Sequence, residues 1–173
     1  MSKTIKIGLS TKSIQKAVHD IETYRVQLPF KCRLFIDRLA NEVGIPIVNT
    51  NIASSRDDSN KSSNVYFVWT ETPTGAYGKL VAENEDILFI EFGAGIHYNN
   101  GNAHPQASEF GYGVGTYPGQ KNAINPGYWW YKDDDGGAPH LSFGTEATMP
   151  MYKAYIEMVT RVVDIAKEVF KDG

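Results

Sequence analysis

The segment at residues 151–170, MYKAYIEMVTRVVDIAKEVF, carries the strongest periodic pattern in the chain and sets its architecture. Its apolar residues fall into two adjacent rows in which the spacing alternates between four and three residues. Thr148 and Pro150 supply a helix start, and charged and polar residues occupy the opposite face. The pattern predicts a C-terminal helix over residues 149–171. The first row is Met151, Tyr155, Met158, Val162, Ile165 and Val169, and the second is Tyr152, Ile156, Val159, Val163, Ala166 and Phe170.

The apolar surface of this helix is unusually wide. The two rows cover about half of the circumference, whereas about 100° is enough to cover one sheet. The helix is therefore either wedged between the sheet and another helix, or it also contacts a second subunit. Internal burial is the simpler of these two interpretations.

The N-terminal region, residues 1–44, is predicted to be helical from Ser10 or Thr11 onward, with Gly44 as its stop. Pro29 lacks a backbone donor and disfavours helical geometry in the residue before it, so it kinks or splits the region. We favour two helices. The apolar residues that carry the helical spacing are Ile14, Val18, Ile21, Leu28, Phe35 and Leu39.

The middle of the chain is predicted to be a strand meander. Residues 53–64 are polar throughout and are expected to form a mobile loop. The apolar segments that follow are joined by connections so short that neighbouring strands must run antiparallel. The expected strands of this meander, residues 65–92, are 65–69, 79–82 and 87–92, and a fourth is expected near residues 128–131.

These elements predict an α+β fold in one domain, residues 1–173. An antiparallel sheet of about four strands is packed on one face by the N-terminal helical region and the C-terminal helix. The chain has 173 residues, of which 42% are hydrophobic, and this is enough for one core.

Composition excludes several classes of partner and location. A net charge of -3 gives no overall basic field for nucleic acid or anionic lipid. No apolar run suits a signal peptide or a membrane span, so we expect the protein to be made in a cytoplasm. Cys32 is the only cysteine, which excludes an internal disulfide, and we expect it to be a buried, inert thiol.

The region at residues 97–145 is a long loop rich in glycine and aromatic residues. Eleven of the sixteen glycines lie between Gly93 and Gly144. Loops longer than about 15 residues are usually functional or disordered, and the aromatic content argues against disorder. We therefore expect a recognition surface, on which the contacts to a neighbouring subunit are Tyr98, Tyr112, Tyr117 and Trp129. For Trp129, a place in the subunit's own core stays equally open.

Catalysis is disfavoured by spacing. His97, His104 and His140, with the aspartates at 133–135, are residue types of a metal site or an acid–base pair. No metalloprotease, nucleophile-elbow, phosphate-loop or calcium-loop pattern accompanies them. We expect no enzyme activity, no cofactor and no metal. Residues 128–131, YWWY, could instead stack on a sugar, although a strand would point only two of the four to one face.

Four segments together resemble one family. They are residues 89–98, FIEFGAGIHY; His104-Pro105; residues 127–131, GYWWY; and residues 143–151, FGTEATMPM, which lead into the final helix. In this order and spacing, over residues 85–170, the chain resembles the minor tail component or tail-completion family of tailed bacteriophages. In that family a strand ending in Glu-Phe-Gly precedes a long aromatic loop and a last helix.

The resemblance implies a structural virion protein of the neck, where the DNA-filled head joins a long non-contractile tail. Identical subunits, six by this resemblance, would form a ring that contacts head-closure, tail-terminator or tail-tube proteins and encloses passing DNA. It implies no catalytic residues. A carbohydrate-binding or receptor-recognition tail module and a metal-dependent cell-wall hydrolase stay open as alternatives.

Overall fold

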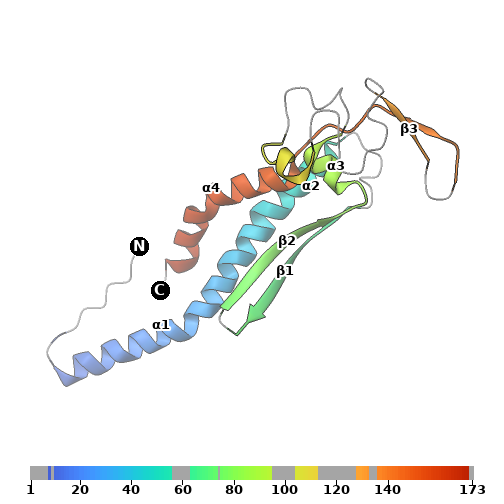
Figure 1. The fold of residues 1–173 in the computed structure, drawn as a ribbon. Coiled ribbons are helices and arrows are strands. Elements are labelled where there is room, and N and C mark those ends of the chain that lie inside the picture. The colour runs from blue at the N-terminus through green and yellow to red at the C-terminus, as the bar shows by residue number, and fades with distance from the viewer. Residues whose placement is uncertain are drawn as a thin grey trace.

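The computed structural model describes Gly8 and residues 10–55, 63–73, 75–94, 104–112, 128–132 and 136–171. The fold mixes helices with short antiparallel sheets, which confirms the predicted α+β class. Figure 1 shows a long N-terminal helix that runs the length of the molecule, with a β-hairpin and the C-terminal helix beside it.

The N-terminal helical path is longer than predicted. Helix α1 (Thr11–Arg38) continues through a π-helical segment, η1 (Leu39–Gly44), into α2 (Ile45–Ala53). Ser10 is the N-cap, since its Oγ accepts a hydrogen bond from the Ser13 N–H at 3.2 Å.

The predicted split at Pro29 and the predicted stop at Gly44 are both wrong. Pro29 lies inside α1, which bends but does not break (Figure 1). Gly44 lies where α2 begins, and a Cβ added to it would approach Leu80 Cδ2 to 2.9 Å and Met158 Sδ to 3.0 Å. Because glycine has no side chain, residues of the first hairpin and of the C-terminal helix can approach the backbone closely at this position.

The first two predicted strands are confirmed as an antiparallel hairpin. Strand β1 (Asn64–Thr72) pairs with β2 (Gly75–Glu83), from Asn64 opposite Glu83 to Thr72 opposite Gly75. The hairpin packs on the N-terminal helices. Its residues Val65, Leu80 and Ala82 lie against a core of Val48, Ile52, Ile90 and Ala154.

The third predicted strand, at residues 87–92, is wrong: these residues form helix α3 (Ile87–Phe92). A short apolar run has no period that separates a buried strand from a buried helix. Ile90 and Phe92 are both buried, and a helix allows apolar residues on several of its sides to be buried. Gly93 ends α3 with φ 76°, a conformation that favours glycine.

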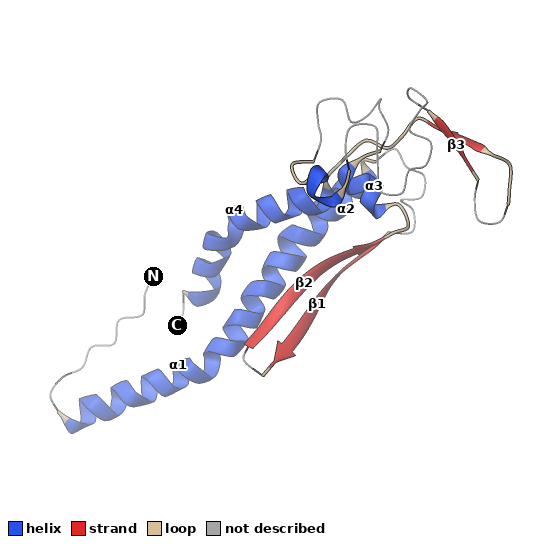
Figure 2. Cartoon of the chain, viewed as in Figure 1, coloured by secondary structure: helices blue, strands red, loops and turns tan. Residues whose placement is uncertain are grey.

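The predicted four-stranded sheet is therefore replaced by two separate hairpins. Strand β3 (Trp129–Tyr131) lies where a strand was expected, but it pairs with β4 (His140–Ser142) rather than with the first hairpin. Figure 2 shows this second hairpin projecting from the body. A 3-10 helix, η3 (Ala107–Phe110), precedes it in the chain. Residues 56–62 of the predicted polar loop lie outside the described residues.

Helix α4 (Pro150–Phe170) confirms the predicted C-terminal helix. It packs on η1, α2 and α1, with Ile165 in a cluster with Leu39 and Val43. The N-terminal helical region and the C-terminal helix were expected to cover one face of the sheet together. For α4 this expectation is wrong. The first hairpin and α4 both contact the N-terminal helical path, which carries the apolar surface that each of them needs.

Cys32 is exposed, which corrects the expected buried thiol. The last turn of α4 reaches only as far as Phe35, where the ring centroids of Phe35 and Phe170 are 6.1 Å apart. Cys32 lies on α1 beyond this point, so α4 does not cover it.

Candidate functional site

The four predicted interface residues are not brought together in the described structure. Tyr98 and Tyr117 lie outside the described residues, and Trp129 is placed in β3 without its side chain being described. Tyr112 is only 6% exposed and stacks on Phe92, with ring centroids 4.8 Å apart. The structure therefore places Tyr112 in the subunit's own core, against the expectation that its ring contacts a neighbour.

Burial also affects the ionisation of Tyr112. Desolvation raises the pKa of its phenol above the usual value, because the phenolate is disfavoured away from water. The cluster around it contains Phe92, Ala107 and Phe89. This ring thus fixes the start of the long loop against the end of α3.

Glu91 is a buried acidic side chain, 6% exposed, whose carboxylate has three hydrogen-bond partners within the chain. Its Oε2 accepts a hydrogen bond from the Met151 N–H at 2.8 Å, and its Oε1 accepts one from the Tyr152 N–H at 2.9 Å. These are free N–H groups in the first turn of α4, whose N-cap Met149 offers no side-chain cap. A carboxylate at a helix N-terminus also complements the helix dipole.

His104 completes this arrangement. Its Nε2 lies 3.0 Å from Glu91 Oε1, and its Nδ1 accepts a hydrogen bond from the Gln106 N–H at 3.0 Å. Since Nδ1 is the acceptor, Nε2 carries the hydrogen and donates to Glu91. The ring is buried between Phe92 and Tyr152, with centroids 4.7 Å and 5.0 Å away.

We call Glu91, His104 and the first turn of α4 the Glu91 clamp. Both carboxylate oxygens and both ring nitrogens already have partners within the chain. Buried polar groups satisfied in this way hold structure together. The clamp joins α3, the long loop and α4, and its geometry is that of a structural device.

The backbone reinforces the clamp. Ala94 and Thr145 exchange two hydrogen bonds of 2.8 Å, and the Thr148 N–H donates to the Ile90 carbonyl at 3.0 Å. Ala94 and Thr145, at the two ends of the long loop region, thus lie side by side. Met149 has a left-handed φ of 55°, and the paired segments on both sides hold this strained residue in place.

The remaining catalytic candidates do not form a site in the described structure. His97 and the aspartates at 133–135 lie outside the described residues, and His140 lies exposed on β4. Across the described ranges, no three or more His, Cys, Asp or Glu side chains are grouped so that they could hold a metal ion. Nor does any helix in those ranges have the length and apolar character needed to cross a membrane.

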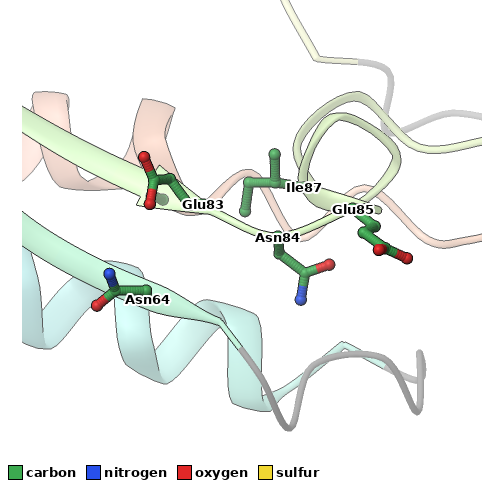
Figure 3. A pocket seen from close by; sticks show the side chains of 6 residues that line it. Asn64, Glu83, Asn84, Glu85 and Ile87 are labelled. Atoms are coloured by element: carbon green, nitrogen blue, oxygen red, sulfur yellow. The ribbon is translucent and has the colours of Figure 1, made fainter.

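A surface hollow beside the end of β2 holds two acidic residues, Glu83 and Glu85 (Figure 3). Their carboxylates point in different directions, and Glu83 already accepts a hydrogen bond from the Tyr66 hydroxyl at 2.7 Å. That bond raises the pKa of Tyr66 above its usual value. The hollow therefore lacks the convergent ligands that a cation needs.

A groove of mainly apolar character lies between α1 and the tip of the first hairpin. It is lined by residues that include Phe30, Ile36 and Trp69. The Arg33 guanidinium lies 5.8 Å from the centre of the Trp69 ring. Trp69 Nε1 is buried and has no acceptor among the described residues.

Helices α1 and α4 both carry exposed apolar residues in the described structure. On α4 the residues that we call the outer band, Tyr155, Ile156, Val159 and Val163, are 46–58% exposed. On α1 the residues that we call the distal band are exposed to a similar degree, and they are Ile14, Val18, Ile21 and Leu28. Exposed apolar residues gathered on one face of a helix are typical of a contact with another protein or with a membrane.

The second hairpin adds an exposed aromatic surface. Trp130 is 60% exposed and pairs with Leu141 across β3 and β4. Tyr128, Leu141 and Phe143 are also exposed. The sequence pointed to this stretch through its aromatic content, whereas the residues of the distal band served there only as evidence for a helix.

Comparison with known proteins returned no match of the chain to any protein-family model, curated protein or solved structure.

Proposed function

We propose that the chain is a structural protein of the neck of a long-tailed, non-contractile bacteriophage. It forms a homo-oligomeric ring that completes the tail and joins it to the DNA-filled head. The observation that carries this proposal is the pair of exposed apolar bands on α1 and α4. A subunit with two different unpaired surfaces is built for head-to-tail association, which generates rings when the rotation closes.

The Glu91 clamp gives a physical account of the residues that resemble the tail-completion family. The Glu-Phe-Gly segment supplies Glu91, the His-Pro pair supplies His104, and the approach to the last helix supplies the N–H groups of Met151 and Tyr152. Segments far apart in the sequence thus meet at one point. A shared structural need for this contact is a reason for the resemblance that does not involve catalysis.

The role of the clamp in the ring is to set the direction of α4. Because Glu91 binds two N–H groups in the first turn, the helix axis is fixed relative to α3. The outer band of α4 is then presented at a defined angle to a neighbouring subunit. Tyr98, Tyr117 and Trp129 stay as predicted contacts to neighbouring ring or neck proteins.

The experiment that tests the proposal has a biochemical and a viral part. Purified protein is examined by sedimentation velocity and by negative-stain electron microscopy, and closed rings are expected. In virions, antibody labelling is expected at the neck, and loss of the gene is expected to leave heads and tails unjoined. Virions that assemble normally without the protein would refute the neck role even if rings form in solution.

The second hairpin favours one alternative. Tyr128 and Trp130 are both exposed, and residues two apart in an extended segment point to the same side. Such a pair could stack on a sugar of a cell-surface receptor. A titration with soluble cell-wall sugars, followed by tryptophan fluorescence, tests this function. A saturable change that Trp130→Ala abolishes would favour the receptor-binding module over the neck ring.

A further inference from the structure

The distal band continues the surface by which α1 binds its own α4. From Ile14 to Leu39 one face of α1 repeats with alternating spacings of four and three residues. Its C-terminal part, at Phe35 and Leu39, packs on Met158, Val162, Ile165 and Val169. Its N-terminal part has the same spacing, and no described helix lies against it, because α4 ends at Phe170 beside Phe35. The residues of this face are Ile14, Val18, Ile21, Arg25, Leu28, Cys32, Phe35 and Leu39.

Three residues of the outer band of α4 belong to a row with the same repeat. Tyr152, Ile156, Val159 and Val163 are spaced by four, three and four residues. This 3.5-residue period is the one that lets two helices interlock their side chains along a shared seam. At a rise of about 1.5 Å per residue, the stretch from Ile14 to Leu28 spans roughly 21 Å and the outer band from Tyr155 to Val163 roughly 12 Å. The two bands therefore match in period, and the outer band is the shorter of the two.

The two bands cannot meet within one subunit. Figure 1 shows the N-terminal part of α1 extending past the C-terminal end of α4. The inner row of α4, with Ile165 buried, already occupies the remainder of α1. A contact between the bands thus requires two copies of the chain.

Charged residues beside the two bands are complementary when the helices run antiparallel. In this orientation, corresponding flanks of the two seams face each other. On one flank, Tyr155 of α4 is exposed, whereas Ala17 of α1 is buried and Val162 of α4 packs within its own subunit. The other flank carries Glu22 on α1, and Lys153 and Lys167 on α4. Opposite charges at such flanks favour one partner and one orientation.

We propose that the distal band of α1 docks antiparallel on the outer band of α4 of a second copy. Centring the bands places Ile14 against Val163, Val18 against Val159 and Ile21 against Ile156, with Glu22 beside Lys153. Lys153 Nζ donates one hydrogen bond to Asn51 Oδ1 at 3.0 Å and has two further donors for Glu22. The contact joins two different surfaces, so each subunit uses its distal band in one contact and its outer band in another. This inference deepens the proposed ring by naming its subunit contact, and it rests on that proposed function.

Cysteine cross-linking in the full chain tests the contact. The background variant is Cys32→Ser, since Cys32 is exposed and lies on the same face of α1. One tagged chain carries Val18→Cys and a differently tagged chain carries Val159→Cys. A bis-maleimide whose span tolerates a shift of one helical turn, about 5.4 Å, links them. A product between the two tags is expected in the mixture, and none is expected from either chain alone.

Matched controls carry the cysteine on the opposite side of each helix. His19→Cys on α1 and Arg161→Cys on α4 are both exposed positions and are expected to give no product. A second test uses charge: Glu22→Lys is expected to reduce the cross-linked yield, and combining it with Lys153→Glu is expected to restore the yield. Circular dichroism confirms that each variant keeps its helices.

The outcomes separate this contact from the neck role. A product from Val18→Cys alone would show that α1 pairs with another α1, which overturns the inference. Rings without a Val18–Val159 product, or a protein that stays monomeric, would overturn it as well. A Val18–Val159 product from a protein that is absent from virions supports the contact and refutes the neck function.

Discussion

Glu91 is the residue on which most other interactions of the long loop depend. It is buried, and its carboxylate accepts hydrogen bonds from His104 and from two backbone N–H groups of α4. Buried donors that lose their acceptor keep the full cost of desolvation. The effect of changing Glu91 should therefore exceed that of any one of its hydrogen bonds.

Replacing Glu91 with Ala is expected to lower the free energy of unfolding by about 3–5 kcal/mol, since it leaves three buried donors without an acceptor. Glu91→Gln keeps one oxygen but turns an NH2 toward a donor, and a loss of about 1–3 kcal/mol is expected. Urea denaturation measures both values. Wild-type stability in Glu91→Ala would show that water replaces the carboxylate, contrary to the clamp.

Gly78 offers a test of packing within the first hairpin. A Cβ added at this position would collide with the Phe67 ring and lie 3.0 Å from Ile36 Cγ2. Gly78→Ala is expected to cost about 1–3 kcal/mol of unfolding free energy, because the rigid ring has to move. Gly75→Ala is the control, since a Cβ there meets nothing within 4 Å. Equal melting temperatures for the two variants would contradict the close packing of Phe67 on Gly78.

Tyr112 predicts a dependence of stability on alkaline pH. Burial raises the pKa of its phenol in the folded state, so the neutral form favours folding. This contribution is fully present below the unfolded pKa of about 10 and is lost as pH rises through the folded pKa. Tyr112→Phe is expected to flatten the fall of melting temperature above about pH 10. An unchanged alkaline profile would mean that the ring leaves the core before it ionises.

Among the elements, α4 divides its two apolar rows between two tasks. The row that contains Val162 packs on the cluster of Leu39, Val43 and Ile165. In the other row, Ile156, Val159 and Val163 are exposed in the subunit. Substitutions at the adjacent residues Val162 and Val163 therefore test folding and association separately.

Val162→Asp is expected to cost several kcal/mol of unfolding free energy, because it places an unpaired charge against the core. Val163→Asp is expected to change subunit stability by about 0.5 kcal/mol or less, as is usual for surface changes, while abolishing self-association. Thermal melting and sedimentation velocity measure the two effects. If Val163→Asp sediments as the wild type does, the outer band is not part of the interface.

The elements also show which features the sequence alone could predict. Helix α4 was predictable because its pattern repeats over 21 residues, whereas six apolar residues at Ile87–Phe92 carry no usable period. Pro29 and Gly44 are local stop signals through which the helical path continues. At Gly44 tertiary packing overrides the signal, since Leu80 and Met158 approach α2 there.

The clamp lay beyond sequence reasoning because its members are separated by the long loop. One signal was present in the sequence: Glu91 is the single charged residue of the Ile87–Phe92 run. An acidic side chain in such a run needs a buried partner, and helix N-termini supply one. The exposure of Ile14, Val18 and Ile21 could not be predicted, since it depends on where α4 ends.

In the described part of the molecule, exposed apolar residues lie on several sides, among them the distal band, the outer band and the second hairpin, and also Val26 and Phe30 elsewhere on α1. Surfaces on different sides of one subunit cannot all be covered by a single symmetric dimer contact. This distribution favours an assembly in which each subunit touches two like neighbours and further proteins.

If the subunit associates in this way, its melting temperature should rise with protein concentration, since association stabilises only the folded chain. Differential scanning fluorimetry across a wide range of concentrations measures this shift. Val163→Asp is the matched control and is expected to melt at one temperature throughout. A wild-type melting temperature that is independent of concentration would argue against self-association under those conditions.

The paired hydrogen bonds between Ala94 and Thr145 have an evolutionary consequence. They close the base of the excursion that carries the second hairpin, and the Glu91 clamp holds the same base from within. Loop closure costs only about 0.6 kcal/mol more for each doubling of loop length. Insertions and deletions between Tyr112 and Thr145 should therefore be nearly neutral for folding. Natural variation can then remodel this appendage to suit new neighbours while the helical body is inherited unchanged.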